Sequence, residues 1–120
     1  MRRFGKFPLK LLSWLPWLWL ALFAVFTAAV TAQQGQWPRY GQPDPKQTGA
    51  LAPLHDVLLA SLVPTLAGPL LLGAIALAFT LTRRVPPFSF GLIATHLSGW
   101  AAMLVLLAGD VAGLGEWFMD

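Results

Sequence analysis

Two histidines are the side chains with the clearest capacity for chemistry in this sequence, and His96 is the stronger candidate. His96 stands inside an apolar block, where an ionisable side chain is costly to place in lipid and often marks a functional site. A neutral imidazole there could ligate a haem iron or the magnesium of a chlorophyll- or bacteriochlorophyll-type pigment, with Trp100 one turn later stacking on the ring. The alternative for His96 is an interhelical hydrogen bond to a hydroxyl or a backbone carbonyl.

The other candidate groups do not add up to a catalytic site. His55 should differ from His96 in depth by more than about 10 Å, too far for both to ligate one iron. His55 and Asp56 are adjacent, so their side chains point about 100° apart on a helix. The chain has no cysteine, which excludes thiolate catalysis and cysteine-ligated metals, and no P-loop, Rossmann or hydrolase motif occurs. We therefore expect no enzymatic activity.

A second pattern in the same block concerns helix packing. Small side chains recur at helical spacing, and they place one narrow face on the helix that carries His96. In lipid, where water supplies no hydrophobic force between helices, such faces let two backbones approach closely. The predicted packing face comprises Gly91, Thr95, Ser98, Gly99 and Ala102.

The composition requires a membrane setting for these residues. Hydrophobic residues make up 57% of the 120 positions and charged residues only 11%, about half the fraction usual in a soluble domain. The apolar residues gather in three long blocks, which is typical of lipid-facing helices. Basic residues flank these blocks and form no water-exposed stripe, so nucleic-acid binding is not expected. The sequence predicts an all-α membrane protein without a soluble domain.

Each apolar block has the length of a transmembrane helix. The predicted spans are residues 11–32, 54–82 and 88–108. Prolines and glycines in the second span should kink it between Pro64 and Pro69. A secretory signal peptide is an alternative for residues 1–32, but the apolar stretch exceeds the usual 7–15 residues, which favours an uncleaved anchor.

The connecting segments follow from proline, glycine and charge. Residues 33–53 contain four prolines and three glycines and should form an external loop. Residues 83–87 form a turn so short that the second and third spans should pair as an antiparallel hairpin. Residues 1–10 are a basic N-terminus, and residues 109–120 an interfacial tail.

Charge gives the expected orientation. Six of the eight Lys and Arg residues flank the spans on one side, at residues 2–10 and 83–84. Because positive residues are retained in the cytoplasm, we expect a multi-pass protein of a bacterial-type inner membrane, with the N-terminus cytoplasmic and the C-terminus external.

Three functions fit these features. The first is a non-catalytic accessory or structural subunit that packs against a larger membrane complex, for example a photosynthetic or respiratory assembly, with the lipid bilayer and other subunits as its partners. The second is an electron-transfer or light-harvesting subunit that holds haem or a chlorophyll-type pigment through His96. The third is a homo-oligomeric pore or small carrier.

Overall fold

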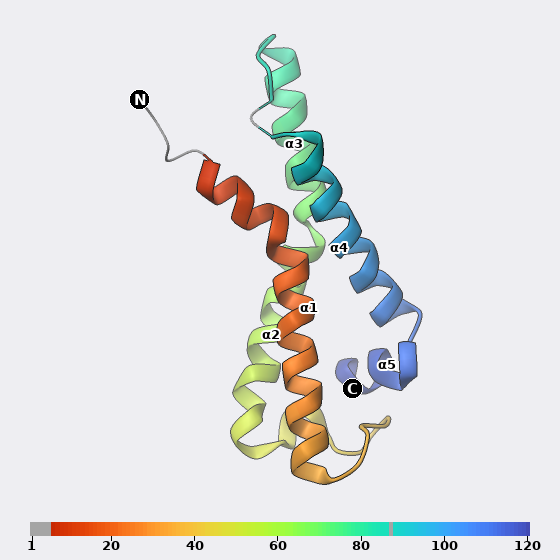
Figure 1. Cartoon of the computed structure of the whole chain (residues 1–120). Coiled ribbons are helices and arrows are strands. Elements are labelled where there is room, and N and C mark those ends of the chain that lie inside the picture. The colour runs from red at the N-terminus through yellow and green to blue at the C-terminus, as the bar shows by residue number, and fades with distance from the viewer. Residues whose placement is uncertain (1–5, 87) are drawn as a thin grey trace.

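The computed structural model describes residues 6–86 and 88–120, and within these ranges every regular element is a helix (Figure 1). The long helices are α1 (Lys6–Gln34), α2 (Ala52–Leu66), α3 (Gly68–Leu81) and α4 (Phe90–Ala108). The short ones are η2 (Pro45–Gln47), η3 (Gly49–Leu51), η4 (Val111–Gly113) and α5 (Leu114–Met119). Arg2, Arg3 and Pro87, which belong to the predicted N-terminal segment and turn, lie outside the described residues.

Among the described residues, three helical stretches are long and apolar enough to cross a membrane. They are Phe7–Gln34, Gly49–Leu81 and Phe90–Ala108. The prediction of an all-helical chain with three membrane-length helices is thereby confirmed. The middle stretch contains the junction between α2 and α3.

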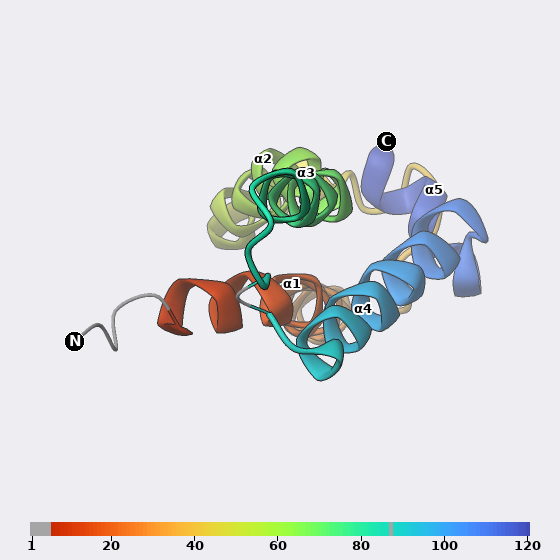
Figure 2. The same cartoon turned by 90° about the horizontal axis from the view of Figure 1, so that it is seen from above.

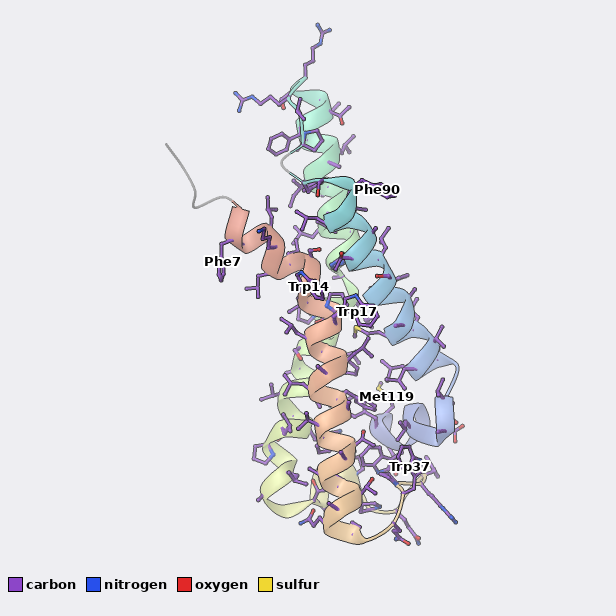
Figure 3. All side chains as sticks on the ribbon, in the orientation of Figure 1. Phe7, Trp14, Trp17, Trp37, Phe90 and Met119 are labelled. Carbon is purple, nitrogen blue, oxygen red and sulfur yellow. The ribbon has the colours of Figure 1, made fainter. Side chains whose placement is uncertain are left out.

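Helix α1 contains a proline and bends near it. Pro16 has no backbone N–H, so the carbonyl of Leu12 lacks the donor that a regular helix would supply. Figure 1 shows the first turns of α1 leaning away from α3, and Figure 3 labels Trp14 and Trp17 close to the bend. A proline-induced kink accounts for this change of direction.

A break at Ala67 separates α2 from α3. Pro69 has no N–H, and the N–H groups of Leu70 and Leu71 both turn to the carbonyl of Ala67, at 3.1 and 3.2 Å. In a continuous helix the N–H of Leu70 would instead bond to the carbonyl of Leu66. The break therefore frees the Leu66 carbonyl at the end of α2, within the stretch where the sequence predicts a kink.

The predicted hairpin between residues 54–82 and 88–108 is not confirmed. Helix α4 packs along α1, and α1 also packs along α2. Seen from above, α2 and α3 lie on one side of the molecule, and α1 and α4 lie on the other (Figure 2). Because α3 ends at Leu81 and α4 begins only at Phe90, the link is longer than the predicted five-residue turn. This length lets α4 leave α3 and settle on α1.

The C-terminal segment folds back onto the bundle. After α4 the backbone turns sharply through left-handed conformations at Asp110, Ala112 and Gly113. Helix α5 follows, and Trp117 and Phe118 are almost completely buried. In the part of the chain that the structure describes, ten buried apolar side chains form the core, and they come from α1, α2, α4 and α5: Trp19, Phe23, Phe26, Val30, Leu58, Leu62, Met103, Leu114, Trp117 and Phe118.

Candidate functional site

His96, on α4, is fully buried where α4 packs against α1. Its Nδ1 is 2.8 Å from the carbonyl oxygen of Leu12. A carbonyl can only accept a hydrogen bond, so Nδ1 carries the proton and donates it. The acceptor is the carbonyl that Pro16 leaves without a helical donor. The hydrogen bond considered for His96 in the sequence is thus present in the structure, and it satisfies a polar group that lipid could not.

The other ring nitrogen of His96 faces the break between α2 and α3. Nε2 is buried without a hydrogen-bond partner among the described residues. A Cβ atom added at Gly68 would lie 2.5 Å from both Nε2 and Cε1 of His96, so the imidazole rests directly on the backbone of α3. In this arrangement the Gly68 backbone occupies the space beside Nε2. A haem or pigment could bind Nε2 only if α3 moved away from α4.

Trp100, the second predicted cofactor residue, is directed at the same break. Its indole Nε1–H donates to the carbonyl of Leu66 at 3.0 Å. This is the carbonyl freed at the end of α2. His96 and Trp100 therefore lie side by side, one turn apart on α4, and they join α4 to the two sides of the Ala67 break.

At Gly99, helix α4 approaches α1 closely. An added Cβ would lie 2.8 Å from Cδ1 of Trp17 and 2.9 Å from Cβ of Pro16. Two hydrogen bonds flank this contact: Ser13 donates to the carbonyl of Leu92 at 2.6 Å, and Trp17 Nε1–H donates to the carbonyl of Thr95 at 3.0 Å. We call this set, together with the bond from His96 to Leu12, the α1–α4 seam.

The other residues of the predicted packing face are less involved. Gly91 and Ser98 are exposed, and Thr95 and Ala102 are half-buried. The hydroxyls of Thr95 and Ser98 bond to carbonyls of α4 itself, at 2.8 and 3.0 Å. The buried residues of α4 are His96, Gly99 and Met103. The buried side of α4 thus includes Gly99 but is rotated away from Gly91 and Ser98.

His55 lies at the opposite end of the molecule, beside α5. It is 1% exposed, packs against the rings of Phe26 and Phe118, and donates from Nε2 to the carbonyl of Phe118 at 3.2 Å. Its Nδ1 is 3.7 Å from the exposed carboxylate of Asp56. Within the described ranges, no cluster of three or more His, Asp or Glu side chains could hold a metal ion. The structure keeps the two histidines in separate environments.

Three tryptophans make contacts that the sequence analysis does not predict. Trp19 donates to the carbonyl of Leu58 at 2.9 Å, and Trp117 donates to the carbonyl of Pro43 at 2.7 Å. Trp37 donates to the carbonyl of Ala112 at 3.1 Å. Their positions suggest only an aromatic belt at the membrane surface. A buried indole N–H needs a hydrogen-bond acceptor, and this requirement is the one feature of the sequence that could have predicted these contacts.

Comparison with protein-family models, with curated proteins and with solved structures finds no match to this chain.

Proposed function

We propose that this chain is a non-catalytic accessory subunit that packs against the helices of a larger membrane complex, of which photosynthetic and respiratory assemblies are examples. The observation that supports the proposal is that α3 contributes almost nothing to the core of the bundle. None of the ten buried apolar residues belongs to α3, and Gly68 at its start is its one buried residue. The remainder of α3 extends past the start of α4 in the view of Figure 1.

One side of α3 is exposed along its length in the described chain. At helical spacing it carries five exposed residues, three leucines with two small residues between them. We call this the α3 face: Leu70, Gly73, Ala74, Leu77 and Leu81. Leucines beside Gly and Ala form a ridge with a hollow, the kind of surface on which a second transmembrane helix packs by van der Waals contact.

The base of α3 is held in place, so the α3 face is presented in a defined position. Trp100 bonds to the Leu66 carbonyl just before α3, and His96 rests on Gly68. A partner helix would therefore bind α3 when its motion relative to α4 is already restricted. Such preorganisation lowers the entropic cost of association.

The orientation that we propose follows from charge. Arg83 and Arg84 follow the far end of α3, and Lys10 is near the start of α1. The acidic residues lie in or beside elements at the other end, which holds residues 35–51 and α5: Asp44, Asp56, Asp110, Glu116 and Asp120. The positive-inside rule supports a bacterial-type inner membrane with the N-terminus in the cytoplasm.

The experiment for the accessory role is purification in a mild detergent with identification of co-purifying subunits. The test variant is Gly73→Leu, because a Cβ added at Gly73 meets no described atom within 4 Å beyond its own helical turns, and we expect the fold to be kept. The control is Gly91→Leu, at an exposed glycine of α4 whose nearest neighbour is its own N-cap Ser89. Partner loss with Gly73→Leu alone supports the proposal, and full retention with Gly73→Leu contradicts it.

A second candidate function is cofactor binding by His96, supported by the unpartnered Nε2 atom; it requires α3 to move away, because the Gly68 backbone lies against Nε2. A ring nitrogen that keeps its lone pair inside a membrane protein has the electronic character of an axial ligand to haem or a chlorophyll-type pigment. The test is the visible absorption spectrum of the purified complex. A band that disappears with His96→Leu and survives His55→Leu supports this function, and a featureless spectrum contradicts it.

A further inference from the structure

A groove of about 340 Å³ opens on the side of the molecule at the loop end, the end that holds residues 35–51 and α5. Its floor is one straight stripe of α1 at spacings of three and four residues: Leu20, Phe23, Ala24, Thr27 and Ala28. Leu106 of α4, Leu114 of α5 and the ring of Trp37 form its walls. Ala24 and Ala28 are small, and this hollows the stripe between its larger neighbours.

The lining of the groove suits a hydrocarbon chain, because seven of its eight residues are apolar. The stripe from Leu20 to Ala28 is about 12 Å long, because a helix rises about 1.5 Å per residue. A single acyl chain, whose carbons contact their neighbours at about 3.5–4.0 Å, is narrow enough to enter.

The position of the groove selects one leaflet. Leu20 is at the middle of α1, and the stripe runs from there toward Gln34, inside the stretch that is apolar enough to span a membrane. Trp37 closes the outer end of the groove, and Figure 3 shows it at the end of the bundle opposite Phe7. Tryptophan is typical of headgroup depth. A chain in the groove would thus belong to a lipid whose headgroup lies beside Trp37.

Polar groups near that end complement a phospholipid. Arg39 follows Trp37 by two residues, so its Cα lies within about 7.6 Å of the Cα of Trp37. Arg39 is exposed, and across residues 6–86 and 88–120 no carboxylate lies within 4.0 Å of its guanidinium. Arginine binds phosphate through paired N–H donors.

We propose that this groove is a binding site for one glycerophospholipid, with an acyl chain along residues 20–28 of α1 and the phosphate at Arg39. The occupant differs from the partner helix proposed for the α3 face, and it contacts the other end of the molecule. A lipid held there fills the space between α1, α4 and α5 that their own side chains leave open.

The test is native mass spectrometry of the full chain, reconstituted with phosphatidylcholine and released from mild detergent. The wild-type protein should retain one phosphatidylcholine. Ala24→Phe, which fills the groove, should lower the retained fraction about tenfold, and Ala28→Phe should act in the same direction. Ala78→Phe is the matched control, because Ala78 is exposed on α3, which lines no part of the groove. Circular dichroism and the Tm identify any variant that has failed to fold. If Ala24→Phe does not fold, Ala28→Phe replaces it in the test.

A second comparison tests the phosphate contact. Arg39→Gln should lower retention of phosphatidylcholine and leave retention of diacylglycerol unchanged, while Arg84→Gln should change neither. Undiminished phosphatidylcholine in both groove-filling variants would overturn the proposal. Equal retention of phosphatidylcholine by the wild type and Arg39→Gln would also overturn the proposal. A dimer in the wild-type spectrum that disappears with Ala24→Phe would overturn it too, because the occupant of the groove would then be a second copy of the chain.

Discussion

His96 of α4 donates a hydrogen bond from Nδ1 to the carbonyl oxygen of Leu12 in α1, over 2.8 Å. This carbonyl is the one that Pro16 leaves without a donor in its own helix. The proline and the histidine are 80 positions apart in the sequence, yet they act on one carbonyl group. The free carbonyl needs a donor inside the membrane, and α4 supplies it only when it packs on α1.

The first prediction is a coupling between these two residues. His96→Leu should lower the free energy of unfolding by about 0.6–1.7 kcal/mol, as expected for an interhelical hydrogen bond in a membrane protein. In a Pro16→Ala background the cost should be smaller, because the new N–H of residue 16 satisfies the Leu12 carbonyl. A double-mutant cycle in mixed micelles measures the difference. Equal costs in the two backgrounds would mean that the bond does not compensate for the proline.

The second prediction concerns the contact of His96 with Gly68. Gly68→Ala places a methyl group 2.5 Å from the imidazole, which is already held on its other side by Leu12. Overpacking of this kind costs about 1–3 kcal/mol, so the Tm should fall. The matched control is Gly73→Ala in the same helix, where nothing lies within 4 Å and the Tm should stay or rise. If both variants melt alike, α3 does not rest on His96.

The third prediction tests the α1–α4 seam. Gly99→Leu should force α4 away from Pro16 and Trp17 and lower the unfolding free energy by about 1–3 kcal/mol. Insertion into the membrane should be unaffected, since leucine is more apolar than glycine. Gly91→Leu, on the exposed side of α4, is the comparison and should leave stability unchanged. A stable Gly99→Leu protein would contradict the seam.

The fourth prediction concerns orientation. Cysteines introduced at Lys46 or Glu116 should react with an impermeant thiol reagent in intact cells, and a cysteine at Arg84 should not react. All three positions are exposed, and the native chain has no cysteine to interfere. Labelling at Arg84 with none at the other two positions would show the inverted topology.

The sequence predicts the spans well because hydropathy over about 20 residues is a local property. Pairing of the spans is not local. The short link between residues 82 and 88 predicts a hairpin, but α4 packs on α1 instead. There, Gly99 allows the two helices to approach closely, and His96 bonds to the free carbonyl of Leu12. A proline in one helix and a histidine in another give no sign in the sequence that they share an acceptor.

The structure shows where the candidate site residues lie, and it does not test their predicted roles. His96, Trp100 and Gly99 do lie at helix contacts, but Gly91 and Ser98 point away from the buried side of α4. The spacing of small residues predicts the packed face of a helix only roughly. The packing of larger side chains such as Met103 determines how the helix is rotated about its own axis. The cofactor role of His96 stays a prediction.

The central claim, that the α3 face is where a partner subunit docks, is most directly tested by photo-crosslinking in native membranes. A benzophenone side chain would replace Leu77 of the α3 face, which is 58% exposed, or Val57 of α2, which is 57% exposed. The two positions are matched in exposure and lie on different helices. We predict a covalent adduct with another membrane protein from Leu77 and lipid adducts alone from Val57. Lipid adducts alone from Leu77, or the same protein adduct from both positions, would contradict the claim.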